Sequence, residues 1–560
     1  MKTLITLTSF LLCINPTFSQ TGQLAVNNIS VTINPSNVMF QTLAPDTNLY
    51  FEAIKGSGLS TLFSSALWVG GIRSSDTALC GSQQAYKFNS IVNTFSTGPL
   101  SATIGTGTIP PFYRDYGAAT ISETEKAKWE KVFCVEKWEI EIFVRFFNCF
   151  QDPSCDVSIS FPGYTIPNSI INWPAHGVVS LGQDFYLAPF FDYDSDGIYS
   201  PSQGDYPCIK GDQYCWFVIN DRGDDTTRTE LGLEIHTEVY SFKRDSSNPL
   251  SNTIFVGRDI INRSSATYTD FIVAQQTDFD IGCAQDDYIG SMPSLNSYFG
   301  YNADQTDDNC SGNSNPYGIN PPAQGVTFLN KSINASVYYN NTAAPSQLNE
   351  IEKAYNSMNG RNRDGTPIYY GAPSSAPPVP TNITKYMFPY LPPSGRAPWN
   401  EVSASNPAGD RRMLGSVAPI TLTPGQVHEV DIAYVFSRND SGNLESVDKL
   451  YRDIQTVQQF YTDSIPAFCG SFVLSQKELT LSQNDVALYP NPATHSFKIE
   501  NETNEILTGS ILSIDGKLVV SEFEISSNND IDISRLTSGI YLVRVTNAKN
   551  QIVLKKLLKH

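Results

Sequence analysis

Residues 486–560 have the most regular pattern in the chain, and it is a pattern of short strands. From Tyr541 to Thr546, residues suited to a buried face alternate with residues suited to an exposed face, which is the period of a half-buried strand. The Asp515-Gly516 pair lies between two apolar runs, and both residue types tolerate the positive φ angles of a two-residue hairpin turn. The pattern therefore predicts a small all-β module over these residues.

The same segment contains several short motifs in a defined order. They are a Tyr-Pro-Asn-Pro opening, an Asp-Gly turn, a Gly-Ile-Tyr strand and a basic last strand, formed by Tyr489, Pro490, Asn491, Pro492, Asp515, Gly516, Gly539, Tyr541, Lys555 and Lys556. In this order the motifs resemble the type A C-terminal sorting domain of the type IX secretion system of the Bacteroidetes. The resemblance implies an immunoglobulin-like β-sandwich that the type IX secretion machinery and its sortase recognise. It also implies export through the periplasm to the cell surface or the extracellular medium, with the body anchored to surface lipopolysaccharide.

Residues 1–19 are typical of a secretory signal peptide. The apolar run Leu4–Phe18 is interrupted and too short to cross the ~30 Å hydrocarbon core of a bilayer. Thr17 and Ser19 are small residues at the positions that precede cleavage, so we expect cleavage before Gln20.

The residues between signal and tail have the composition of a β-sandwich protein with long loops. The chain contains 28 Tyr, 31 Phe, 37 Gly and 34 Pro, and many short alternating runs. We expect a mainly β fold with a multi-domain β-sandwich body and a few short helices. The expected divisions are a β-rich N-terminal region (20–120), a central β domain with Asp-rich loops (121–330), a loop-rich region with strands and an amphipathic helix (331–473), and a linker (474–485). One large β domain with insertions is the alternative.

Two segments of the body are expected to be helical. Residues 122–125 form a capping-box pattern that predicts a helix start, and residues 444–461 carry apolar side chains at helical spacing. Residues 135–147 are rich in aromatics and suit either a helix or a strand.

Most of the body also resembles a group of uncharacterised, surface-directed Bacteroidetes proteins that carry the same tail. The matching landmarks are residues 173–177, 186–190, 192–199, 204–207, 278–290, 320–326, 410–412 and 425–438. This resemblance implies a location and no particular activity.

The acidic composition limits the class of partner. The formal net charge is −19 at pH 7, which disfavours nucleic acid and anionic membrane surfaces and suits cations. Glycans or other surface proteins are the partners we expect for the body.

The cysteines predict disulfides in an exported protein. Of the 10 Cys, Cys13 lies in the expected signal, where the large Leu12 before it disfavours a lipoprotein, so an odd number remains. Short spacings favour the pairs Cys149 with Cys155, Cys208 with Cys215, and Cys283 with Cys310. Cys80, Cys134 and Cys469 are then left over, and at least one thiol stays free or pairs with another chain.

The best candidate for a metal site is Asp192-x-Asp194-x-Asp196-Gly197-Ile198. Alternate carboxylates followed by Gly let a chain wrap around a hard cation, with the Ile198 carbonyl as a further ligand. An EF-hand would need Glu where this chain has Gln203, so Asp205 is the expected substitute in a longer calcium loop. A solvated acidic turn is the alternative.

A second acidic group consists of Asp278, Asp280, Asp286 and Asp287. It is a weaker calcium candidate, and two of its carboxyls could instead form the pair of a glycosidase, which needs a separation of about 5–10 Å.

Two histidines lie in patterns of their own. Glu234, His236 and Glu238 share one face of an expected strand, where a base or metal ligand is conceivable but a solvent-exposed face is more common. His176 is expected to be a packed turn residue.

No motif of a known catalytic machinery is present: the sequence lacks His-Glu-x-x-His, Gly-x-Ser-x-Gly and P-loop patterns. The sequence therefore favours a non-catalytic, calcium-stabilised adhesion or binding module. A secreted polysaccharide hydrolase, using acids such as Asp278 or Glu234 beside exposed aromatics such as Trp216, and a surface filament subunit are the alternatives.

Overall fold

The computed structural model places the chain in two compact units, Met1–Pro466 and Ala467–His560. It describes residues 21–43, 46–87, 93–101, 120–223, 229–308, 310, 315–340, 351–371, 382–390, 399–464, 486–501, 507–513, 518–525, 530–547 and 552–560. The expected signal peptide, the linker 474–485 and the Asp515-Gly516 turn lie outside these residues. We call the first unit the body and the second the tail, and describe each by itself.

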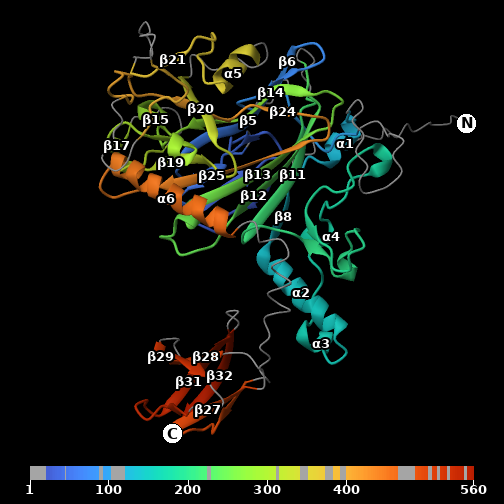
Figure 1. Cartoon of the computed structure of the whole chain (residues 1–560), viewed down its shortest axis with the longest axis vertical. Helices are drawn as coiled ribbons and strands as arrows, with labels where there is room; N and C mark the ends of the chain where they lie inside the picture. The colour runs from blue at the N-terminus through green and yellow to red at the C-terminus, as the bar shows by residue number, and fades with distance from the viewer. Residues whose placement is uncertain are drawn as a thin grey trace, which may run out of the picture. The chain divides into compact units, whose positions relative to one another are not determined.

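The body is built on two large antiparallel sheets (Figure 1). The nine-stranded sheet has the order β15 (Asp287–Met292), β16 (Ser297–Asn302), β19 (Ala323–Phe328), β25 (Val427–Ser437), β13 (Thr253–Asn262), β12 (Leu233–Ser241), β11 (Gln213–Asn220) and β7 (Ser96–Thr97), with β8 (Phe133–Glu136) also paired to β11. The seven-stranded sheet has the order β20 (Ile333–Asn340), β23 (Arg411–Val417), β14 (Tyr268–Phe279), β5 (Leu62–Arg73) and β3 (Val38–Met39), with β24 (Ile420–Leu422) paired to β14 and β6 (Ala78–Gln83) paired to β5.

Alternate residues of the two sheets meet in one buried core. Ile235, Val256 and Ile432 of the nine-stranded sheet belong to the same apolar cluster as Val69 and Val273 of the seven-stranded sheet. Because successive side chains of a strand point to opposite faces, each sheet can give one full face to this core. The body is therefore a β-sandwich.

Smaller elements surround the sandwich. A three-stranded sheet consists of β1 (Gly22–Leu24), β2 (Ile29–Ile33) and β4 (Phe51–Ala53). Three two-stranded ribbons pair β9 (Phe190–Phe191) with β10 (Tyr206–Pro207), β17 (Thr306–Asp307) with β18 (Gly318–Ile319), and β21 (Ile368–Tyr369) with β22 (Ile383–Thr384).

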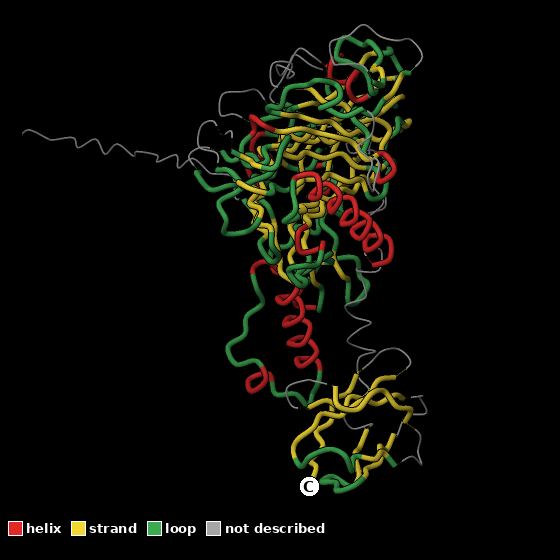
Figure 2. The backbone as a smooth tube through the Cα atoms, turned by 90° about the vertical axis from the view of Figure 1, so that its left-hand side faces the viewer, coloured by secondary structure: helices red, strands yellow, loops and turns green. Residues whose placement is uncertain are grey.

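The helices are few, as predicted from the composition (Figure 2). Among the described residues the α-helices are α1 (Glu123–Lys128), α2 (Lys137–Gln151), α3 (Val157–Ser160), α4 (Asn168–Ile171), α5 (Ile351–Met358) and α6 (Asn443–Ser464). Ser122 caps α1 by accepting a hydrogen bond from the backbone N–H of Glu125 at 3.2 Å, which confirms the predicted helix start. The apolar face of α6, with Leu450 and Ile454 fully buried, packs on β19 and β25. The described residues contain no helix that is both long enough and apolar enough to span a membrane.

The expected mainly β fold is confirmed, but the divisions at residues 120 and 330 do not separate compact units. The nine-stranded sheet takes β7 from before the first division and β25 from after the second. The body thus follows the alternative of one large β domain with insertions, because strands distant in sequence pair side by side.

The tail is a smaller β-sandwich. One sheet has the order β26 (Val486–Tyr489), β27 (Ser496–Asn501) and β30 (Ile531–Asp532), and the other has the order β29 (Leu518–Ile525), β28 (Leu507–Ser513), β31 (Gly539–Asn547) and β32 (Ile552–Lys559). Phe497 from the first sheet and Ile511, Val543 and Val545 from the second share one buried core. The alternation predicted from Tyr541 onward is therefore that of a strand with one buried face.

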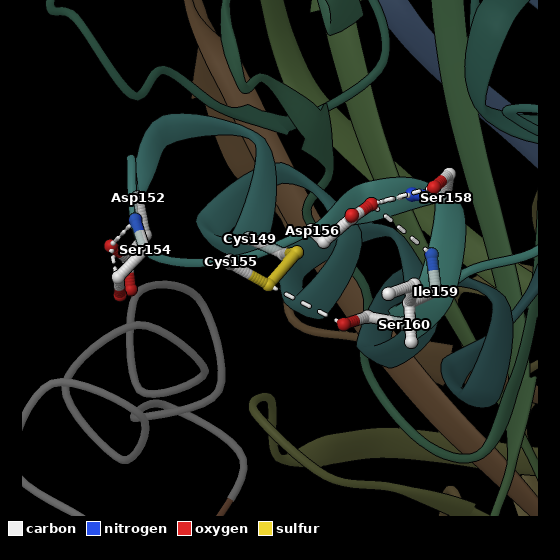
Figure 3. Close-up of a disulfide and its surroundings, with 8 residues drawn as sticks. All are labelled: Cys149, Asp152, Ser154, Cys155, Asp156, Ser158, Ile159 and Ser160. Atoms are coloured by element: carbon white, nitrogen blue, oxygen red, sulfur yellow. Dashed lines mark hydrogen bonds between the residues drawn. A yellow bond between two sulfur atoms is a disulfide. The ribbon is translucent and has the colours of Figure 1, made fainter.

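Two of the three predicted disulfides are present, Cys149–Cys155 (Figure 3) and Cys283–Cys310. The predicted pair Cys208–Cys215 is wrong, because Cys215 is bonded to Cys134. The strands β8 and β11 place these two cysteines directly opposite each other, although they are 81 residues apart. Cys208 is also disulfide-bonded, and Cys80 is a buried free thiol.

Candidate cation sites and a polar cleft

The first acidic site lies in residues 192–205, which we call the Asp192 loop. Carboxylate oxygens of Asp192, Asp194 and Asp205 all lie within 4.8 Å of one another. Asp205 is fully buried and accepts hydrogen bonds from the backbone N–H groups of Tyr193 at 2.8 Å and Ser200 at 2.7 Å. Burial raises the pKa of Asp205, and the nearby Asp192 and Asp194 charges raise it further. Three convergent carboxylates of this kind suit a hard cation such as calcium.

Local backbone geometry explains why the loop closes. Gly197 has a φ of 78°, which a glycine adopts without strain, and its N–H donates to Asp192 Oδ2 at 2.7 Å. The ribbon of β9 and β10 pairs Phe191 with Tyr206 and so brings the two ends of the loop together.

One member of the predicted ligand set, Asp196, lies outside the convergent group. The carboxylate of Asp196 accepts the backbone N–H of Ile198 at 2.7 Å, and Asp196 does not belong to the convergent group. The predicted role of the Ile198 carbonyl stays a prediction, and this residue is 55% exposed. Gln203 donates to Asp194 Oδ2 at 2.9 Å, so it orients a predicted ligand.

His176, which precedes the Asp192 loop in the chain, binds the backbone of this loop through a hydrogen bond. Its Nε2 accepts the backbone N–H of Tyr199 at 2.8 Å, and its Nδ1 lies 3.1 Å from the carbonyl of Phe185, to which it donates. The ring stacks on Phe185 with centroids 4.2 Å apart, and burial lowers the pKa of His176. The structure thus places His176 as a packed, neutral turn residue.

The second predicted group of four acids is split in the structure. Asp278 and Asp280 lie with Asp410, and oxygens of these three residues lie within 4.8 Å of one another. We call this trio the Asp278 cluster. Burial raises the pKa of Asp278 well above its usual value, and burial together with the Asp410 charge raises the pKa of Asp280 to about 7.

Asp286 and Asp287 are not members of this trio. The chain turns at Gly282, with a φ of 71°, and Asp287 then begins β15 of the nine-stranded sheet, whereas Asp278 lies on β14 of the seven-stranded sheet. Asp287 is fully buried and accepts the backbone N–H of Ile281 at 2.9 Å. The four predicted acids therefore do not converge at one point, because the chain turns at Gly282 and leads Asp287 into another sheet.

Asp280 of the Asp278 cluster also lines a large cleft. The cleft has a volume of about 970 Å³ and is bordered by the three-stranded sheet, by residues 42 and 46–50 and by the start of β5. Its walls combine hydroxyl, amide and carboxyl groups with three aromatic rings, and they include Thr32, Asn48, Asp46, Glu52, Tyr50 and Phe63. Sequence reasoning missed this cleft, since no local motif connects residues 21–63 with residues 280–315.

The Glu234–His236 pair lies in a buried charge network and not on a solvent face. Glu234 is fully buried, and His236 Nε2 lies 2.8 Å from Glu234 Oε1. Arg263 lies 3.9 Å from Glu234 and 2.7 Å from Asp184. Burial alone would raise the pKa of Glu234 and lower that of His236. The interaction between the two residues reverses both directions, with Arg263 further lowering the pKa of Glu234 and with Asp259 and Asp184 further raising that of His236, so the ion pair is favoured.

Glu238 on β12 and Trp216 on the neighbouring strand β11 are also covered by other side chains. Glu238 pairs with Lys210 and accepts a hydrogen bond from Tyr214 Oη at 2.8 Å. Trp216, expected as an exposed aromatic, is only 2% exposed. Both expectations fail because β12 and β11 are interior strands and neighbouring side chains cover these two residues. Lys210 and Tyr214 contact Glu238, and the rings of Phe133 and His236 pack on Trp216.

In the tail, the opening motif is held against the last strand. Asn491 donates from Nδ2 to the carbonyl of Lys556 at 2.6 Å and accepts the N–H of Leu558 at 2.9 Å. Gly539 and Tyr541 on β31 pair with Lys559 and Leu557 on β32. The remaining described sorting residues are Tyr489, which is 68% exposed, Pro490, Pro492, Lys555 and Lys556.

Comparison with known families supports the prediction that the tail is a sorting domain. Residues 487–560 match the secretion system C-terminal sorting domain. This confirms the predicted type IX sorting tail, so the protein interacts with the type IX secretion machinery and is exported to the cell surface or the extracellular medium.

Comparison with whole proteins supplies no argument about the body. No curated protein matches the chain. Among solved structures, a polysaccharide lyase shares 8% identity over 58% of this chain and 34% of the lyase, with a TM-score of 0.17. The BSP domain of a biofilm-associated protein shares 8% identity over 62% of this chain and 60% of that chain, with a TM-score of 0.13. Scores this low establish neither a common fold nor a common function.

Proposed function

We propose that the body is a non-catalytic, calcium-stabilised binding module that holds a glycan in the polar cleft at the cell surface. The observation that carries the proposal is the lining of the cleft. Hydroxyl and amide groups such as those of Thr32 and Asn48 can exchange hydrogen bonds with sugar hydroxyls, and the partly exposed ring of Phe63 offers an apolar face to a sugar ring.

The cleft also has a suitable size and charge for this class of ligand. Its volume of about 970 Å³ lies at the upper end of ordinary ligand sites, which suits several linked sugars. Asp46, Glu52 and Asp280 make the walls acidic, which disfavours polyanions and favours neutral or amino sugars.

Other parts of the proposal follow from the tail. Cleavage of the tail by the sortase and attachment of the body to lipopolysaccharide would place the cleft at the outer surface of the cell. The resemblance of the body to uncharacterised proteins with the same tail stays a prediction and agrees with this location.

A panel of immobilised polysaccharides tests the proposal, with retention of the purified protein and release of soluble sugar scored in the same wells. We expect retention without products, and roughly tenfold weaker retention for Phe63→Ala because a stacking surface is lost. Ile159→Ala is the matched control, since Ile159 is 77% exposed on α3 and does not line the cleft. Equal retention of Phe63→Ala and wild type would show that the cleft is not the binding site.

A polysaccharide hydrolase is the second candidate, and one observation favours it. Asp280 lines the cleft, and its raised pKa of about 7 is suited to a general acid, while Glu52 offers a second carboxyl in the same cleft. Release of products that Asp280→Asn abolishes would support this candidate over the binding module.

A further inference from the structure

The Asp278 cluster has a geometry that the Asp192 loop does not share, because two strands of a sheet hold it. Asp278 lies opposite Arg412 in the antiparallel pairing of β14 with β23. Asp280 follows the end of β14, and Asp410 precedes the start of β23, so both flank the same end of this strand pair. The sheet therefore holds three carboxylates together in a rigid frame.

The hydrogen bonds of Asp278 leave one of its oxygens available. Asp278 Oδ2 accepts a hydrogen bond from Tyr86 Oη at 2.9 Å and lies 3.1 Å from Arg412 Nη2. Asp278 is only 1% exposed, so solvent does not reach its Oδ1 atom. This oxygen also accepts no hydrogen bond from any residue that the structure describes. A buried carboxylate oxygen without a partner is costly, and a hard cation satisfies such an oxygen directly.

The charges of the cluster favour a divalent ion. Arg412 lies 2.7 Å from Asp410 and pairs with Asp278 through its other amino group. Three ionised carboxylates and one guanidinium carry a formal charge of about −2, which one divalent cation would neutralise. Asp280 lines the cleft, so an ion can enter the cluster from solvent.

We propose that Asp278, Asp280 and Asp410 form a binding site for one divalent cation of the calcium class in the wall of the polar cleft. Carboxylates supply part of the six to eight oxygens that calcium takes, and waters on the cleft side complete the shell. The site is separate from the Asp192 loop and does not depend on the proposed glycan binding.

Calorimetric titration of calcium alone into the purified full chain tests the site. The protein carries Asp192→Asn with Asp194→Asn, so that the Asp192 loop does not contribute. We expect about one calcium per chain. Adding Asp280→Asn or Asp410→Asn should weaken this binding at least roughly tenfold, because each removes one charged ligand. Asp46→Asn, which removes an acid from the same cleft outside the cluster, should leave the affinity within about twofold.

Two results would overturn the proposal. One is the absence of calcium binding once the Asp192 loop is inactivated. The other is binding that neither Asp280→Asn nor Asp410→Asn weakens. Thermal melting in EDTA checks that each variant is folded, and we expect Asp280→Asn to melt no lower than its parent, since it relieves repulsion among the carboxylates. If calcium does not bind while Asp280→Asn melts higher, the cluster holds a shared proton and not a metal ion. Glycan retention is measured separately, so either proposal can fail alone.

Discussion

Arg263 supplies the positive charge that pairs with two buried carboxylates, those of Asp184 and of Glu234 on β12. Its guanidinium is 1% exposed and lies between the carboxylates of Asp184 and Glu234. Its Nη2 also donates to the carbonyl of Gly182 at 2.9 Å, so the same side chain holds the covering loop on the sheet. Removing one member of a buried pair leaves uncompensated charge, which costs more than the pair contributes.

We therefore expect Arg263→Met to lower the free energy of unfolding by about 3–5 kcal/mol. Urea denaturation measures the change. Arg244→Met is the matched control, because Arg244 is partly exposed and pairs with Asp212 at 3.4 Å, and its loss should cost less than about 1 kcal/mol. Equal effects of the two substitutions would contradict the role assigned to Arg263.

The lowered pKa of His428 makes the free energy of unfolding depend on pH. Burial, with a smaller contribution from the Lys331 charge, lowers the pKa of His428 from 6.5 to about 4. The folded state then binds fewer protons at His428 than the unfolded state does. The stability that the neutral side chain contributes is therefore fully present above pH 6.5 and is lost as the pH falls toward 4.

We expect this loss to reach at most about 3 kcal/mol, and His428→Phe should remove it because the new side chain does not titrate. Urea denaturation of wild type and variant at several pH values between 7 and 4 gives the difference curve, in which all other titrating groups cancel. A flat difference curve would show that His428 is not the group responsible.

At the scale of elements, the Asp192 loop is an insertion of the sandwich that brings three carboxylates together. Because these like charges repel without a cation, calcium should stabilise the folded body by mass action. We expect EDTA to lower the melting temperature by several degrees, and Asp192→Asn with Asp194→Asn to reduce the difference to the part that the proposed Asp278 site contributes. Scanning calorimetry with and without EDTA measures it.

Asp196→Asn serves as the control for this loop. Asp196 lies in the same turn but outside the convergent group, so its substitution should leave most of the EDTA effect. Wild-type protein that melts at one temperature with and without EDTA would exclude a stabilising cation at this loop.

At the scale of the whole molecule, the body and the tail are separate compact units with separate tasks. We expect a chain that lacks residues 486–560 to stay in the periplasm, because the sorting domain is the part that the secretion machinery recognises. Fractionation followed by immunoblotting measures its location. The truncated body should keep the melting temperature of the body in the full chain, and arrival of this folded body at the cell surface would contradict the assigned role of the tail.

Local features of this protein were predictable because neighbours in sequence create them. The Ser122 cap, the alternation after Tyr541 and the convergence of Asp192 with Asp194 each depend on a few consecutive residues. Short disulfide loops such as Cys149–Cys155 belong to the same class. The sequence alone also determined that the chain is exported, since the sorting motifs lie within one small domain.

Strand pairing decided everything that combines distant segments. It placed Asp410 beside Asp278, bonded Cys134 to Cys215, and joined residues 21–63 with Asp280 around one cleft. It also buried Glu234 by making β12 an interior strand with a covered outer face. These outcomes depend on which strands become neighbours, and strand order is set by the packing of the whole core, which no local pattern of residues contains.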